Sequence, residues 1–213
     1  MTRISRSVTS LIVAGYVAGA SVYPAIPKPF CGPQCDISIG RLFIAFLLPT
    51  ATLLLPMLLN ALWTRDPVRD RNEETERLYQ RIVLRVELLI LGIHLAVLTA
   101  FATTLRSDVI QVLARLVPMM FGIAVVSIGN VIPRLRPNLV IGIRTRHTLS
   151  NRAVWMSTHR IAGYIAVACG LAIATGPIGL ALPVGSRMIL LVGPFALLSI
   201  PALIIYSNRK ARA

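Results

Sequence analysis

The chain has 213 residues, of which 55% are hydrophobic and only 14% are charged. A soluble domain carries about 25% charged residues, so this chain has too little polar surface to face water, and a soluble globular protein is excluded. The net charge of +14 lies mainly in short segments between apolar runs, which is typical of membrane topology and gives no reason to expect a nucleic-acid partner.

Six apolar runs follow one another and predict an all-α fold, a polytopic transmembrane helical bundle. The runs cover roughly residues 8–24, 39–63, 83–105, 109–132, 160–182 and 186–206. Each is long enough to cross about 30 Å of hydrocarbon at about 1.5 Å per helical residue. The first run follows Arg3 and Arg6, so a cleaved signal peptide is the alternative to a span there. Gly15 and Gly19, four residues apart, predict a close-packing face on it.

The second run contains two prolines and ends on an aromatic residue. Pro49 and Pro56 predict a kinked or broken helix. Trp63 is expected to act as an interfacial anchor. The charged segment 64–82 follows, and residues 73–81 within it predict a short amphipathic helix that enters the third span. The third and fourth runs are separated only by residues 106–108, which predicts a tight antiparallel hairpin.

The Arg and Lys residues are distributed unevenly between the two sides of such a bundle. With the N-terminus inside, 16 of the 22 fall in cytoplasmic segments, four fall outside and two lie within spans. This asymmetry predicts six spans with both termini in the cytoplasm. The nearly exclusive use of Arg suggests a GC-rich bacterial genome, so the expected location is a bacterial inner (plasma) membrane, crossed in several passes.

This topology divides the chain into two halves of three spans each. Residues 1–107 would carry the outer loop 25–38 and the cytoplasmic charged segment 64–82, and residues 108–213 would carry the cytoplasmic loop 133–159. Cys31 and Cys35 lie in the outer loop, where a disulfide is chemically permitted, and two free thiols are the alternative. A metal site needs more ligands than these two cysteines and Asp36 supply, so no metal is expected.

Three ionisable residues lie inside the third and fourth spans. Glu87 and His94 are seven residues apart and therefore share a helix face, while Arg115 lies near the outer end of the fourth span. Ionisable groups within a membrane are functional candidates by default. They support one alternative function, a small membrane transporter or exporter. Pairing of Glu87 with a nearby arginine and snorkelling of Arg115 are the structural alternatives.

The loop between the fourth and fifth spans has a regular pattern of turn and cap residues. Pro133 and Pro137 are expected to stop the fourth helix, and Gly142 permits a tight turn. A capped helix is predicted to follow, with Ser150 or Asn151 as its N-cap. Trp155 and His159, four residues apart, are expected to share one face of that helix.

This segment resembles the C-terminal signature of the SdpI-like immunity proteins, most strongly over residues 129–163. The matching positions are Gly129, Asn130, Pro133, Arg134, Pro137, Asn138, Gly142, Ile143, Arg144, Thr145, Thr148, Leu149, Ser150, Asn151, Trp155, Thr158, His159, Arg160 and Gly163. The resemblance implies immunity, in which a membrane protein protects its cell from a secreted killing peptide. It also implies that some members signal by holding a cytoplasmic repressor.

We therefore expect an integral membrane immunity or signalling protein that binds a partner and performs no catalysis. Its expected partners are membrane lipids with anionic headgroups, and a peptide toxin or a cytoplasmic repressor, and no cofactor is expected. The arginine-rich loop could instead simply fix topology, and His159 could be a structural hydrogen-bonding group rather than a proton-sensitive switch. The candidate binding residues in the loop are Asn130, Arg134, Asn138, Arg144, Thr145, Thr148, Asn151, Trp155, His159 and Arg160.

Overall fold

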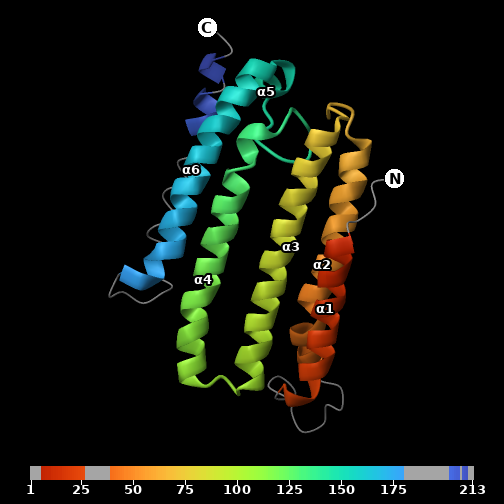
Figure 1. Cartoon of the computed structure of the whole chain (residues 1–213), viewed down its shortest axis with the longest axis vertical. Coiled ribbons are helices and arrows are strands. Elements are labelled where there is room, and N and C mark those ends of the chain that lie inside the picture. The colour runs from red at the N-terminus through yellow and green to blue at the C-terminus, as the bar shows by residue number, and fades with distance from the viewer. Residues whose placement is uncertain (1–5, 27–38, 180–201, 207, 211–213) are drawn as a thin grey trace.

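The computed structural model describes residues 6–26, 39–179, 202–206 and 208–210. Its elements, in chain order, are all helical: α1 Arg6–Val22, the 3-10 turn η1 Tyr23–Ala25, α2 Ile39–Arg65, α3 Glu73–Ala102, α4 Ser107–Gly129, the 3-10 turn η2 Ile132–Arg134, α5 Arg146–Ser150 and α6 Arg152–Gly179. The long helices run roughly side by side along one axis (Figure 1). The chain is therefore an all-α helical bundle, as the sequence predicted.

Five of the described helices are long and apolar enough to cross a membrane. Their outward faces carry large apolar side chains, including Val17, Leu58 and Ile123, each close to 60% exposed. Such faces suit lipid and would be unfavourable in water. The expected sixth span falls mostly on residues outside the described part of the chain. The number of spans, their orientation and the division into halves near residue 107 stay predictions.

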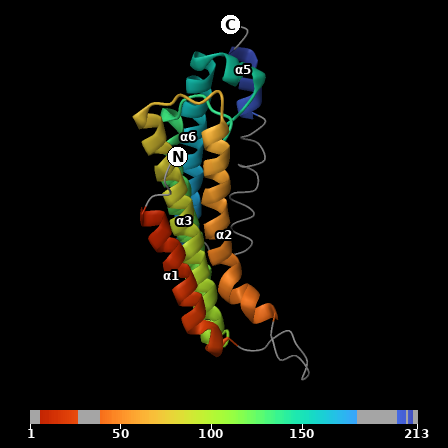
Figure 2. The same ribbon diagram turned by 90° about the vertical axis from the view of Figure 1, so that its right-hand side faces the viewer.

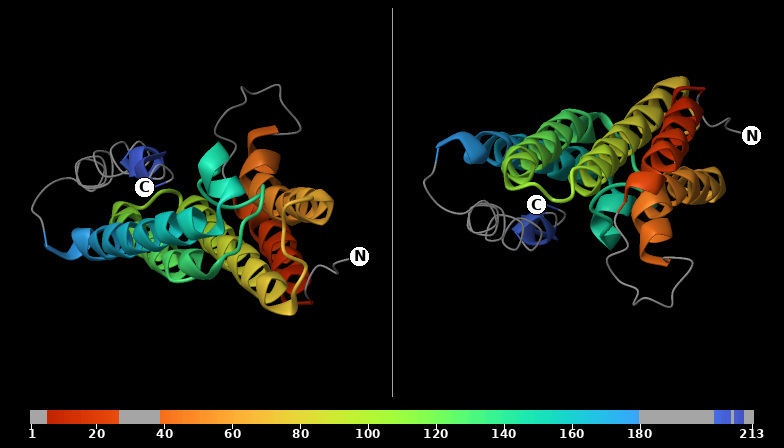
Figure 3. Two further views of the ribbon diagram at one scale, coloured as in Figure 1. Left: turned by 90° about the horizontal axis from the view of Figure 1, so that it is seen from above. Right: turned by 90° about the horizontal axis from the view of Figure 1, so that it is seen from below.

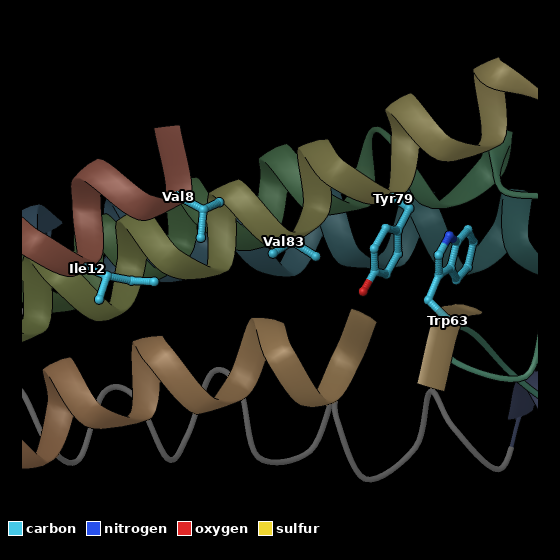
Figure 4. Close-up of a cluster of buried hydrophobic side chains, with 5 residues drawn as sticks. All are labelled: Val8, Ile12, Trp63, Tyr79 and Val83. Atoms are coloured by element: carbon cyan, nitrogen blue, oxygen red, sulfur yellow. The ribbon is translucent and has the colours of Figure 1, made fainter. Parts of the chain in front are cut away.

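Three helices, α1, α2 and α3, contact one another, and α3 also contacts α4, which packs along α6. The views along the long axis place α1–α3 on one side and α4 with α6 on the other (Figure 3). Their buried residues form small clusters. One of these joins Val8 and Ile12 of α1, Trp63 of α2, and Tyr79 and Val83 of α3 (Figure 4).

Two close helix crossings depend on glycine. A Cβ at Gly19 would overlap the backbone carbonyl of Ala45, so the predicted close-packing face of α1 is confirmed against α2. Pro49 lies four residues after Ala45 and has no N–H, so it cannot donate the usual helical hydrogen bond to the Ala45 carbonyl. Gly19 lets the backbone of α1 approach this carbonyl. In the other crossing, Gly122 of α4 faces Gly170 of α6, and Gly129 faces Gly163. The two glycine pairs let the backbones of α4 and α6 touch.

Several sequence predictions about α2 and α3 can now be compared with the structure. Helix α2 is not broken at its prolines, although it bends along its length (Figure 2). The anchor assignment of Trp63 is wrong: its ring is fully buried and stacked on Tyr79, with ring centroids 4.1 Å apart. Both partners of the ring lie on α3: the ring stacks on Tyr79, and Trp63 Nε1 donates a hydrogen bond to the Glu76 carboxylate at 2.8 Å. These two contacts turn the ring inward.

The predicted amphipathic helix 73–81 is the first part of α3 and continues without interruption into the span. Asn72 caps its start by accepting a hydrogen bond from the Thr75 N–H at 2.7 Å. The predicted hairpin between α3 and α4 is confirmed. Its turn places two non-glycine residues, Thr104 and Leu105, in the left-handed region, which the sequence did not suggest.

Candidate functional site

The loop that carries the sequence signature lies at one end of the bundle, near the turn between α2 and α3 (Figure 1). We call residues 130–151 the loop platform, because they fold into a fixed arrangement of short turns, η2 and α5. We call this end of the molecule the arginine-rich end. The platform is held by polar side chains that point inward, and it presents arginines outward.

The first half of the platform is shaped by Asn138, which is fully buried. Its Oδ1 accepts hydrogen bonds from the N–H groups of Val140 and Ile141, at 3.0 and 2.7 Å. Its Nδ2 donates to the carbonyl of Arg136 at 2.9 Å. An amide can serve donors and acceptors at once, so this one side chain forms the turn that the flanking backbone cannot close by itself.

The middle of the platform crosses the start of α6 at a glycine. Gly142 has φ +125°, a conformation that L side chains rarely adopt, and a Cβ there would overlap His159 Nε2. The imidazole of His159 stacks on the indole of Trp155, with centroids 3.9 Å apart and planes 18° apart. The expectation that these two residues share a helix face is confirmed, and the loop crosses directly over them.

The hydrogen bonds of His159 define its tautomer. Nδ1 lies 2.9 Å from the carbonyl oxygen of Trp155, which can only accept, so Nδ1 carries the proton. Nε2 accepts a hydrogen bond from the N–H of Ile143 at 3.0 Å and therefore carries none. Both bonds together require the neutral imidazole. Trp155 Nε1 in turn donates to the carbonyl of Leu135 at 2.7 Å, so the stacked pair holds the loop at two points.

Two caps complete the platform. Thr145 and Thr148 form a capping box at the start of α5, and Thr148 Oγ1 also donates to the carbonyl of Ile143 at 2.8 Å. Of the two proposed caps of the next helix, Asn151 is the one used: its Oδ1 accepts from the N–H of Ala153 at 2.9 Å and from that of Val154. Ser150 instead belongs to α5.

The remaining candidate binding residues of the loop are exposed. Asn130 and Arg134 are exposed at the end of α4 and in η2, and Arg160 is exposed on α6. Arg144 is exposed as well, and its guanidinium donates to the carbonyl of Leu139. Arg146 and Arg152 add two further exposed cations near α5. The structure thus divides the predicted site residues into an inward set that holds the loop and an outward basic set.

Two acidic residues from the other half of the chain anchor the platform, and sequence reasoning missed them. The buried carboxylate of Asp66 accepts from the N–H of Leu139 at 2.5 Å and from that of Val68 at 2.8 Å. Asp70 pairs with Arg136 at 2.5 Å. The only signal available was that five of the eight acidic residues of the chain lie in the charged segment 64–82, and nothing in the sequence paired two of them with residues 136 and 139.

The other predicted site residues lie elsewhere. Glu87 and His94 are both buried on α3, whereas Arg115 is exposed on α4 and does not share their buried face. Cys31 and Cys35 fall outside the described residues, and Cys169 is a free thiol on α6. Among the described residues, no group of three or more His, Cys, Asp or Glu side chains is placed to hold a metal ion.

Comparison with known proteins gives one family match, which includes part of the arginine-rich end. Residues 134–207 match the SdpI/YfhL protein family. No curated protein and no solved structure gave a significant match to the chain. The matched segment contains most of the loop platform, the stacked Trp155–His159 pair and all of α6. Over residues 134–207 the chain is therefore similar to the SdpI/YfhL protein family.

Proposed function

We propose that this chain is an immunity protein of the bacterial plasma membrane, which protects its cell from a secreted antimicrobial peptide or from envelope stress. The observation that carries the proposal is the family match over residues 134–207, the segment that builds most of the platform. The span-forming helices agree with it, because a killing peptide that attacks the envelope would meet its target in the membrane.

The protein acts by binding rather than by catalysis in this proposal. The buried polar groups of the platform are engaged by backbone: Asn138, Thr148 and His159 all bond the loop itself. A reaction centre would need such groups to face a substrate. Residues used in this way hold a surface in one shape, which suits recognition of a partner.

The outward arginines define the chemistry of the proposed partner. Arg134, Arg146, Arg152 and Arg160 are exposed around the platform, and a guanidinium binds carboxylates and phosphates through several donors at once. An acidic cytoplasmic protein, such as a repressor held at the membrane, would fit this surface. Anionic lipid headgroups are the other partner with matching charge.

The test is protection in cells that are sensitive to secreted killing peptides. We expect the wild-type chain to raise survival in co-culture with a peptide-producing strain. A variant with Arg146→Glu, Arg152→Glu and Arg160→Glu should reach the membrane in the same amount and lose this protection, because its surface would repel an acidic partner. Arg106→Glu is the matched control, since Arg106 is also exposed but lies in the turn between α3 and α4.

Two outcomes would contradict the proposal: a wild-type chain that gives no protection against any producing strain, or a triple variant that protects as well as the wild type. The alternative, a small membrane transporter or exporter, predicts a different pattern. It predicts that Glu87→Gln abolishes the phenotype while the arginine variant keeps it. The buried positions of Glu87 and His94 are the observation in its favour, and the exposed position of Arg115 is against a joint role of all three.

A further inference from the structure

Helix α3 carries three buried titratable side chains on the face that it turns toward α1 and α2. Tyr79, Glu87 and His94 are at most 1% exposed. At 100° per residue they fall within about a quarter of the helix circumference, and Glu87 lies about 12 Å from Tyr79 and about 10 Å from His94 along the axis. All three belong to the helix Glu73–Ala102, which is long and apolar enough to cross the membrane.

Glu87 is the unusual member of this set. Both of its carboxyl oxygens are buried and have no hydrogen-bond partner in the described structure. An ionised carboxylate without a partner is very unfavourable inside a protein, and more so within a membrane, so this carboxyl requires a cation or a proton. His94 is similar but less extreme, since Nε2 donates to the carbonyl of Gly15 at 3.2 Å while Nδ1 is buried without a partner.

Among the described residues, no charged group on the neighbouring helices is placed as that cation. Helix α1 carries Arg6 at its exposed start, and α2 carries Arg41 and Arg65 near its two ends. The faces of these two helices that turn to α3 hold uncharged residues, such as Ile12, Gly15, Thr52 and Asn60. Tyr16 of α1 shares a hydrogen bond with Thr50 of α2. The ionisable groups of α4, Asp108 and Arg115, are exposed, and Arg85 of α3 lines the groove toward α4.

The chemistry of the site selects the proton over a metal ion. Hard metal cations require several oxygen ligands, often six or more. Around Glu87 the described residues supply one carboxyl group, and they form no cluster of three potential ligands. A lone carboxyl group in apolar surroundings binds a proton well, because protonation removes the charge that burial penalises.

Nearer to the arginine-rich end, the same helix carries Tyr79 beside a small cavity. A cavity of about 10 Å³ lies between α1, α2 and α3, where Tyr79, Asn60 and Gln80 line it together with apolar side chains. This volume is at the lower limit of what one water molecule requires, about 10 to 15 Å³ by the same measure. The Tyr79 hydroxyl is buried without a hydrogen-bond partner, and it points toward α2 (Figure 4). Tyr79 lies two helical turns nearer than Glu87 to the start of α3.

We propose that Glu87 is a proton-binding group inside the α1–α3 unit, whose buried carboxyl group is a neutral acid at neutral pH. In the uptake step one oxygen of the Glu87 carboxylate takes up a proton, and the carboxylate becomes a neutral acid. The aqueous phase supplies the proton, and release is the reverse. The site does not depend on the function proposed for the loop platform.

Infrared spectroscopy of the full-length protein in lipid nanodiscs tests the assignment. We expect the carbonyl stretching band of a protonated carboxylic acid to persist at neutral pH, where exposed carboxyl groups are ionised. Glu87→Gln should remove this band completely, and Glu87→Asp, which keeps an acid, should shift it. Glu73→Gln is the matched control and should leave it unchanged, because Glu73 lies on the same helix with its side chain 86% exposed.

A wild-type protein without the band at neutral pH, or a band that survives in Glu87→Gln and keeps its position in Glu87→Asp, would overturn the assignment.

Discussion

At the scale of single residues, the direction of a side chain separates two roles within one sequence signature. His159 and Trp155 face inward and fix the backbone of the loop platform, whereas Arg146, Arg152 and Arg160 face outward. The imidazole of His159 accepts a backbone hydrogen bond, so the hypothesis that it has a structural role agrees with its contacts. The inward residues give the loop its shape, and the outward ones can meet a partner.

The Ile143–His159 bond leads to a prediction for this residue. His159→Leu would leave the Ile143 N–H without an acceptor, which costs about 1 to 3 kcal/mol for a buried group. We expect the Ile143 amide to exchange hydrogen for deuterium faster, measured by mass spectrometry on the protein in lipid. His159→Gln is the control, since its side-chain carbonyl can reach the position of Nε2 and accept the bond. Unchanged exchange in His159→Leu would show that the bond contributes little.

At the scale of helices, glycine sets how closely α1 approaches α2. Gly19 lies against the Ala45 carbonyl so closely that a methyl group would overlap a backbone atom. Gly15, one turn earlier on the same face, would place a methyl group 3.5 Å from Pro49, which is ordinary contact. Two glycines that look equivalent in the sequence therefore tolerate substitution differently, because only one of them meets backbone.

The pair gives a matched prediction. Gly19→Ala should lower the free energy of unfolding by about 1 to 3 kcal/mol, the usual range for overpacking, because one of the two backbones must move. Gly15→Ala should be neutral or slightly stabilising, since alanine is a better helix former than glycine. Unfolding of the purified protein by SDS in mixed micelles measures both. Equal effects of the two substitutions would contradict the close approach at Gly19.

At the scale of the whole molecule, the platform connects the turn between α2 and α3 with the segment that leads into α6. The carboxylate of Asp66 holds the Leu139 N–H, and Val140 and Ile141 pack against the cluster built around Trp63 and Tyr79. Asp66 is nearly fully buried, whereas Asp70 and its partner Arg136 are partly exposed. The two acidic residues should therefore contribute unequally to docking.

This difference can be measured with trypsin, since the platform is rich in arginine. Asp66→Ala leaves two backbone N–H groups without their acceptor, and hydrogen bonds to charged groups contribute about 1.5 to 3 kcal/mol each. We expect faster cleavage after Arg134, Arg144 and Arg146. Asp70→Ala should change cleavage little, because a partly exposed ion pair contributes at most about 1 kcal/mol. A similar cleavage rate for Asp66→Ala and wild type would contradict the anchoring role.

The sequence by itself determined the helical class, the apolar runs that became helices, the close-packing face at Gly19 and the shared face of Trp155 and His159. These features follow from composition and from the period of one helix, so they depend on neighbours within a few residues of each other. The six-span count and the cytoplasmic placement of both termini also rest on the sequence alone and stay predictions.

Only the tertiary structure decided what lies against what. It turned Trp63 inward onto Tyr79, placed Asp66 under Leu139 and left both oxygens of Glu87 without a partner. The residues of the first two pairs are 16 and 73 positions apart, and they meet only because α2 and the loop platform both pack against α3. Local patterns carry no information about such contacts, since a residue's partners across a bundle depend on how whole helices cross.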